Sequence, residues 1–175
     1  VTGGYPEIPG DTILARRRYA REHLDHLRTA LMWEPRGHAD MYGCFLTDPV
    51  TRDGDFGILF MHNEGFSTMC GHGTIAVIHA VLEAGMLPLD RPETRVRIDS
   101  PAGAITAFAE LDGDRVSAVR FENVVSFVSE LDASVDVPGF GEVRYDLAFG
   151  GAFYAYVDAP SLSLSLEPSN GAALI

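Results

Sequence analysis

The stretch MCGHGTIAVIHAVLEAG, residues 69–85, decides the fold that we predict for this chain. Its second part is an almost unbroken apolar run with the length of a helix, and Gly85 and then Pro88 mark its end. We therefore predict a helix over residues 71–85. Because this helix is apolar on most sides, the rest of the protein must enclose it almost completely. The simplest enclosure is a curved, mostly antiparallel sheet that wraps round the helix.

Short segments with the composition of strands make up most of the remaining chain. Turn signals such as Asp53-Gly54 separate several of them. One segment alternates Arg95, Arg97 and Asp99 with apolar residues, which predicts that these three side chains face water. The predicted strands cover residues 40–47, 56–62, 94–100, 104–110, 116–121, 124–130, 142–149 and 153–157. The predicted fold class is therefore α+β, a β half-barrel round a central helix with Cys70 at its mouth.

A second helix is predicted over residues 11–32, where leucines recur at helical spacing. Asp11 is its predicted N-cap, and Pro35 and Gly37 end it. The basic cluster of the chain lies in this helix, and we interpret it as a solvated face. It consists of Arg16, Arg17, Arg18 and Arg21.

The composition excludes several classes of protein. The net charge of -12 argues against nucleic-acid binding, which needs a basic surface. The sequence has no lysine, so it holds neither a P-loop nor the lysine that binds pyridoxal phosphate. No apolar run is long enough to cross a bilayer. The two cysteines form no CxxC pair, Cys44 is predicted to be a buried inert thiol, and a reducing cytoplasm fits both cysteines.

Cys70 stands where the central helix begins, and this position indicates a reactive thiol. Backbone N–H groups at a helix start have no partner within the helix, and the helix dipole favours negative charge there. Both effects stabilise a thiolate, which is the form of cysteine that acts as a base or nucleophile. Gly71 and Gly73 carry no side chain that would keep a small anion from these N–H groups, and His72 adds an imidazole.

Two other kinds of site use the same residues. A zinc site could combine Cys70 and His72 with His62 or His79, but the spacing matches no recognised metal motif, so we predict no metal. The cradle could also bind a small carboxylate without turnover. We interpret His79 as a core residue of the central helix.

Three segments resemble the proline racemase family. Residues 62–76, HNEGFSTMCGHGTIA, are similar to its first catalytic motif. Residues 35–43, PRGHADMYG, and 150–155, GGAFYA, match two further family segments. The family includes proline racemases, 4-hydroxyproline 2-epimerases and trans-3-hydroxy-L-proline dehydratases. The resemblance spans nearly the whole chain.

The resemblance implies a fold and a set of site residues. The family has a diaminopimelate-epimerase-like fold of two similar halves with the active site between them. This chain would supply the first catalytic half over residues 1–157 and the start of the connection to the second half over 158–175. Cys70 would be the catalytic acid/base for the α-proton of a proline-type substrate, while Gly71, His72 and Gly73 hold its carboxylate. No metal, flavin or nicotinamide is implied, and a homodimer is left open.

The reaction depends on the second half of the family's fold. A second cysteine there gives racemisation or epimerisation, whereas a threonine accompanies the dehydratases. Ala152 and the segment 36–42 look more like the dehydratases. The resemblance therefore favours dehydration of trans-3-hydroxy-L-proline to Δ1-pyrroline-2-carboxylate over the alternative, a proline racemase or 4-hydroxyproline 2-epimerase.

Overall fold

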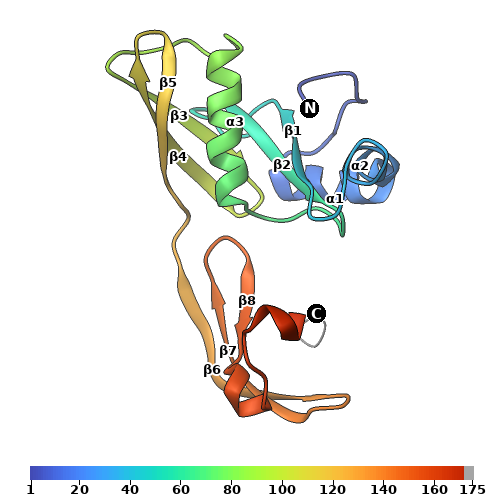
Figure 1. Ribbon diagram of the computed structural model, residues 1–175. Coiled ribbons are helices and arrows are strands. Elements are labelled where there is room, and N and C mark those ends of the chain that lie inside the picture. The colour runs from blue at the N-terminus through green and yellow to red at the C-terminus, as the bar shows by residue number, and fades with distance from the viewer. Residues whose placement is uncertain (172–175) are drawn as a thin grey trace. The chain divides into compact units, whose positions relative to one another are not determined.

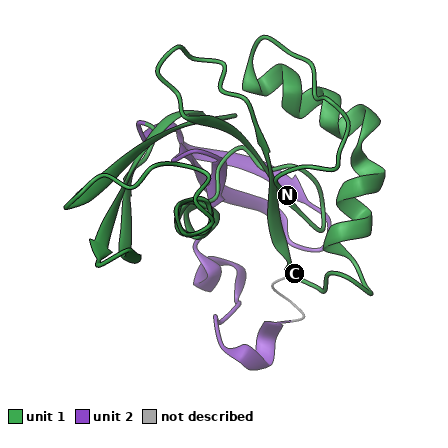
Figure 2. Cartoon of the chain, turned by 90° about the horizontal axis from the view of Figure 1, so that it is seen from above, with its two compact units in different colours: residues 1–124 green, residues 125–175 purple. Residues whose placement is uncertain are grey.

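The computed structural model describes residues 1–171. The chain divides into two compact units, unit 1 over Val1–Val124 and unit 2 from Val125 onward (Figure 2). Within residues 1–171, no helix is long and apolar enough to cross a membrane. The division falls inside the segment predicted as one catalytic half. The assignment of residues 1–157 to that half and of 158–175 to a connection stays a prediction.

Unit 1 contains a five-stranded sheet in the order β1-β2-β3-β4-β5 (Figure 1). Its neighbouring strands are antiparallel except β2 and β3, which are parallel. The helix α3 lies between β2 and β3 in the sequence and provides the crossover that parallel strands need. The elements are α1 (Ile13–His23), α2 (Asp25–Met32), β1 (Tyr42–Thr47), β2 (Phe56–His62), α3 (Gly71–Glu83), β3 (Glu93–Ser100), β4 (Gly103–Asp112) and β5 (Arg115–Glu122).

The sheet of unit 1 is covered on both faces, and strand β2 shows why. Successive side chains of a strand point to opposite faces. Ile58 and Phe60 belong to a core cluster with residues of α3, whereas Leu59 and Met61 belong to a second core with residues of α1 and α2. Figure 2 looks along α3 and shows the curved sheet arching over it, with α1 and α2 on the other side. The predicted α+β half-barrel is confirmed.

Helix α3 buries one face rather than its whole surface. Its buried side chains recur at helical spacing and are Thr74, Val77, Ile78, Val81 and Leu82. Ile75 is 41% exposed, and His79 is exposed and lies 3.6 Å from a carboxylate oxygen of Glu83. His79 is therefore not the core residue that we predicted. The helix ends at Glu83, two residues early, because Gly85 adopts a left-handed conformation with φ 67°.

The predicted helix over residues 11–32 is two helices that meet at Leu24. The N-cap is Thr12 rather than Asp11, because the Thr12 hydroxyl accepts the N–H of Ala15 at 3.1 Å. A second correction concerns Asp99, which is 4% exposed and does not face water. Its carboxylate accepts the N–H groups of Val50 and Thr51 at 2.7 and 2.8 Å, so the loop before β2 folds over it.

Unit 2 is a three-stranded antiparallel sheet with the strand order of the sequence, β6-β7-β8. Aromatic rings of the three strands contact one another: Phe127 and Phe149 stack with centroids 5.2 Å apart, and Phe149 and Phe153 are tilted with centroids 5.0 Å apart. The strands are β6 (Phe127–Val137), β7 (Gly141–Phe149) and β8 (Phe153–Tyr156), followed by short 3-10 helices at Ala159–Leu162 and Pro168–Asn170. The strands predicted from sequence in both units are confirmed to within a few residues at most ends.

Candidate active site

Cys70 is the N-cap of α3. Its backbone is extended (φ -147°, ψ 112°), and its Sγ accepts the N–H of Gly73 at 3.4 Å. Its carbonyl oxygen accepts the N–H of Thr74 at 2.9 Å and the Thr74 hydroxyl at 2.8 Å. The sulfur thus takes the place of the oxygen with which Ser, Thr or Asp caps a helix. This geometry aligns the Cys70 sulfur with the first turn of α3, as the sequence predicts.

The imidazole of His72 lies beside this sulfur. Its Nδ1 is 3.5 Å and its Nε2 3.6 Å from Cys70 Sγ. The His72 residue is exposed, whereas Cys70 is only 6% exposed. The structure therefore brings together the thiol and the imidazole that the sequence singles out.

The electrostatic balance at Cys70 differs from the expectation of a stabilised thiolate. Burial raises the pKa of the Cys70 thiol above its ordinary value, and the hydrogen bond from the Gly73 N–H lowers it by less. The sulfur belongs to the apolar core cluster under α3, so the loss of water outweighs a single N–H donor. In the described part of the chain, burial therefore disfavours the thiolate that the sequence predicts at Cys70.

The glycines of the motif have separate structural reasons. A Cβ on Gly73 would lie 3.0 Å from Cys70 Sγ and 3.3 Å from Phe60 Cε1, so a side chain there would push against the sulfur. The first N–H groups of a helix have no acceptor within it. In residues 1–171, the Gly73 N–H donates to Cys70 Sγ, while the structure gives the N–H groups of Gly71 and His72 no acceptor. These two groups suit a small anion.

Two aromatic side chains continue from His72 to the end of strand β2. The ring of Tyr42 meets the His72 ring edge to face, with centroids 5.1 Å apart and planes at 73°. On the other side, Tyr42 lies against His62, with centroids 5.2 Å apart. Nothing in the local pattern links Tyr42 to a histidine thirty residues later, so its contact with His72 was not predicted.

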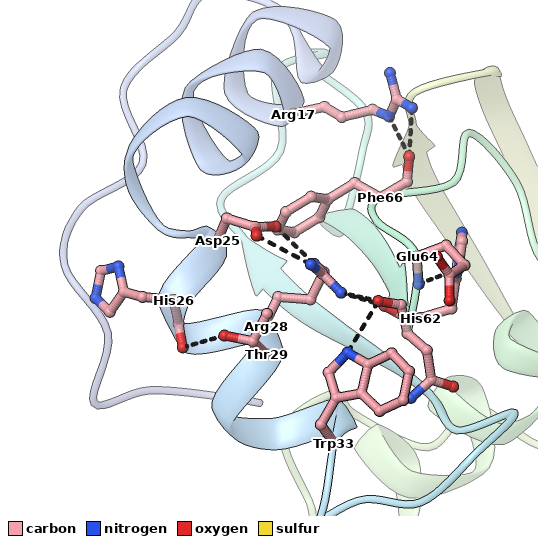
Figure 3. Close-up of polar contacts among 10 residues, drawn as sticks. Arg17, Asp25, His26, Arg28, Thr29, Trp33, His62, Glu64 and Phe66 are labelled. Carbon is pink, nitrogen blue, oxygen red and sulfur yellow. Dashed lines mark hydrogen bonds and ion pairs between the residues drawn. The ribbon is translucent and has the colours of Figure 1, made fainter.

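A buried arginine anchors the loop that leads to Cys70 (Figure 3). Arg28 donates from Nη1 to the carbonyl oxygens of His62, at 2.9 Å, and Asn63, and from Nε and Nη2 to the Asp25 carboxylate at 2.6 and 3.0 Å. Trp33 Nε1 also donates to the Asn63 oxygen, at 3.2 Å. Arg28 is a structural residue that was not predicted from the sequence. The available signal was its position four residues after Leu24 and three after Asp25, which places a charged residue on the buried stripe of the helix.

The basic cluster of α1 is not simply a solvated face. Arg16 donates to Gly10 O and Thr47 Oγ1, both at 3.0 Å, and Arg17 Nε donates to Phe66 O at 2.8 Å. Both side chains are half-buried. Arg17 therefore holds the same loop that Arg28 holds at its other end.

The zinc alternative gains no geometric support. His79 is exposed on α3 and pairs with Glu83, and among residues 1–171 no three His, Cys, Asp or Glu side chains gather as a metal site. Cys44 and Cys70 are both free cysteines. Cys44 is half-buried in β1, and burial raises its pKa, which agrees with a thiol of low reactivity.

The chain matches the proline racemase family over residues 1–175. It is 53% identical over 169 residues to a 3-hydroxyproline 2-epimerase of Burkholderia multivorans. The matched residues make up 97% of this chain and 50% of that protein. It is also 53% identical over 169 residues to a trans-3-hydroxy-L-proline dehydratase of Burkholderia cenocepacia, again 97% of this chain and 50% of that protein.

A solved structure agrees with these relatives. The crystal structure of a hydroxyproline epimerase from Agrobacterium vitis, with bound trans-4-hydroxy-L-proline, gives a TM-score of 0.88 at 35% identity. The likeness covers 99% of this chain and 51% of that one. An α+β half-barrel with a cysteine at the start of its central helix is the class of protein that the fold and the site define. The chain belongs to the proline racemase family. It spans about half the length of the relatives it matches.

Proposed function

We propose that the whole protein carrying this chain removes the α-proton of a hydroxyproline with Cys70, without a metal or organic cofactor. The reaction that we favour is dehydration of trans-3-hydroxy-L-proline to Δ1-pyrroline-2-carboxylate. The observation that carries the proposal is the Cys70 sulfur on the first turn of α3, with the His72 ring 3.5 Å away. The Burkholderia cenocepacia dehydratase at 53% identity supports the choice of reaction.

The site offers what abstraction of an α-proton requires. A proton next to a carboxylate is weakly acidic, so fixed donors must meet the charge that develops on the carboxylate in the transition state. The unpaired N–H groups of Gly71 and His72 are assigned this role. Gly73 shares its N–H with the sulfur, and its missing side chain keeps the sulfur and the cradle together.

In the proposed dehydration, Cys70 and His72 together accept and donate each proton that is transferred. The thiol first passes its proton to the neighbouring imidazole, and the thiolate then takes the α-proton of the substrate. The electron pair of the broken C–H bond forms a C=C bond and expels the 3-hydroxyl, which leaves as water with the proton from His72. The enamine then tautomerises to the cyclic imine. Both residues return to their starting protonation.

Epimerisation at the α-carbon is the second candidate, since the Burkholderia multivorans relative of equal identity is named a 3-hydroxyproline 2-epimerase. It begins with the same proton abstraction by Cys70. It differs in the second step, in which a proton returns to the opposite face and the hydroxyl stays in place.

Proton NMR in D₂O separates these outcomes. The whole protein, with trans-3-hydroxy-L-proline, should consume the substrate and form the imine if it is a dehydratase. An epimerase should return substrate that carries deuterium at the α-carbon and the inverted configuration. Protein that exchanges no α-proton would be a binder, and the proposal would fail.

A matched pair of variants assigns the base. Cys70→Ser should abolish exchange while retaining the fold, because a serine hydroxyl also caps the helix. Cys44→Ser, the only other cysteine of the chain, should leave exchange intact. Exchange that survives in Cys70→Ser would refute the role of Cys70.

A further inference from the structure

We propose that Tyr42 and His62 are positioning residues that hold the imidazole of His72 beside the Cys70 sulfur. The proposal rests on the proposed function only for what His72 does in the reaction. It extends the site from the motif around Cys70 to the paired ends of strands β1 and β2, which the motif does not contain.

The sheet itself places the first two rings. In the antiparallel register of β1 and β2, Tyr42 is the partner of His62, at the first residue of one strand and the last of the other. Residues directly opposite each other in such a pair present their side chains on the same face of the sheet. Their rings accordingly lie 5.2 Å apart with an interplanar angle of 33°.

Tyr42 transmits this fixed position to the site. Its ring meets His72 edge to face, the arrangement that aromatic quadrupoles favour. His72 is exposed to solvent. Without the contact with Tyr42, its side chain would be free to exchange rotamers. With Tyr42 against one side, the ring is kept where both of its nitrogens lie within 3.6 Å of the Cys70 sulfur.

Hydrogen bonds of His62 and Asn63 fix the far end of this row of rings. His62 Nδ1 accepts the N–H of Glu64 at 3.1 Å, which sets the ring plane and requires an unprotonated Nδ1. Burial and then the nearby charge of Arg28 lower the pKa of His62, so the ring stays neutral. Asn63 fixes the entry to β1, because its Oδ1 accepts the N–H of Met41, the residue before Tyr42, at 3.1 Å.

The exposure of Tyr42 distinguishes positioning from simple packing. Tyr42 is 41% exposed and belongs to neither of the two core clusters of unit 1, so its replacement by leucine leaves both cores in place. The cost of losing the ring should therefore fall on the order of His72 rather than on folding.

Three variants of the whole protein test the proposal. Tyr42→Leu should lower kcat for α-proton exchange by about 10- to 100-fold, the size of effect that misplacement of a catalytic group by about 1 Å produces. Tyr42→Phe keeps the ring and its contact with His72, so it should lower kcat by less than Tyr42→Leu does. Tyr19→Leu is the matched control, because Tyr19 also packs on a histidine, His23, with centroids 4.5 Å apart, but on α1. It should leave kcat unchanged.

A double-mutant cycle shows whether Tyr42 acts through His72. If it does, the variant with both Tyr42→Leu and His72→Ala should be no slower than His72→Ala alone. Additive losses, a normal kcat in Tyr42→Leu, or a Tyr42→Phe variant as slow as Tyr42→Leu would each overturn the proposal. The same set of variants is also compared by the rate at which iodoacetamide alkylates Cys70, a measurement that does not depend on turnover. If the parent exchanges no α-proton but the alkylation cycle is non-additive, the proposed function fails and the positioning role stands.

Discussion

Replacement of Arg28 by methionine should destabilise unit 1 by about 2–4 kcal/mol, because each lost hydrogen bond from a charged donor costs about 1.5–3 kcal/mol. Two backbone acceptors, the carbonyls of His62 and Asn63, lose their contacts with the guanidinium. The loss is partial, since Gly65 N–H still reaches His62 O at 3.3 Å and Trp33 Nε1 still reaches Asn63 O at 3.2 Å. The side chain of Asp25 is 43% exposed, so its separated charge adds little. Methionine fills most of the volume that the arginine leaves.

Urea unfolding followed by tryptophan fluorescence measures this change directly, because Trp33 is the only tryptophan and contacts the same loop. A loss of 3 kcal/mol corresponds to a fall of about 6–12 °C in Tm for a protein of this size. Arg18→Met, an exposed arginine on α1, is the matched control and should change stability by less than about 0.5 kcal/mol. A loss of less than about 1 kcal/mol in Arg28→Met, the net value of an ordinary hydrogen bond, would refute the anchoring role.

The pH dependence of stability provides a second test of the ion pair between Arg28 and Asp25. The side-chain hydrogen bond from Arg28 lowers the pKa of Asp25 below that of an ordinary aspartate. A lowered pKa contributes stability above the unfolded value, about 3.9, and this contribution is lost as the pH falls through the folded value. The difference in stability between the parent and Arg28→Met should therefore shrink below about pH 4. A difference that grows on acidification would contradict this account.

Two further predictions concern the approach to the site and the thiol. Gly37→Ala should destabilise unit 1 by about 1–3 kcal/mol, since the new Cβ would collide with the backbone of Met32. Gly3→Ala, where nothing lies within 4 Å of the new Cβ, should leave the stability unchanged in the same urea unfolding experiment, and equal stabilities of the two variants would contradict the packing argument. The alkylation rate of Cys70 in a Cys44→Ser background should rise with a midpoint above the ordinary thiol value of about 8.5, because burial raises its pKa. A midpoint below that value would mean that the helix start dominates.

Local patterns predicted the helices and strands of this chain because the hydrophobic pattern of a segment reflects which of its faces are buried. The apolar segment 56–62 is a strand buried on both faces, and the run after Cys70 is a helix that begins one residue later. Asp99 shows the limit of such patterns. Alternation with Val96 and Ile98 indicates a wet face, but the loop at residues 50–51 folds over this position and supplies two N–H donors. No local pattern shows which loop covers a strand.

The candidate site also contains residues that a local pattern predicts and residues that only the tertiary structure brings together. Cys70 and His72 are adjacent in the motif, so their proximity in space follows from one turn of helix. Tyr42 and Arg28 come from distant segments, and only the register of β1 with β2 and the packing of α2 bring them to the site. The pKa shift of Cys70 was likewise not predictable from the sequence, because its direction depends on how deeply the tertiary structure buries the sulfur.

The raised pKa of Cys70 and its proposed role as a base are compatible if the thiolate forms only in the complex with substrate. In the free site, burial disfavours the charged sulfur, and one N–H donor does not offset this effect. A proline-type substrate brings a positively charged amine, and an opposite charge within about 4–6 Å of a thiol favours its ionised form. The imidazole of His72, 3.5 Å from the sulfur, can accept the proton at that moment. On this argument the position of the His72 ring matters more than the fraction of thiolate in the free site, and the proposed role of Tyr42 and His62 is to hold that ring beside the sulfur.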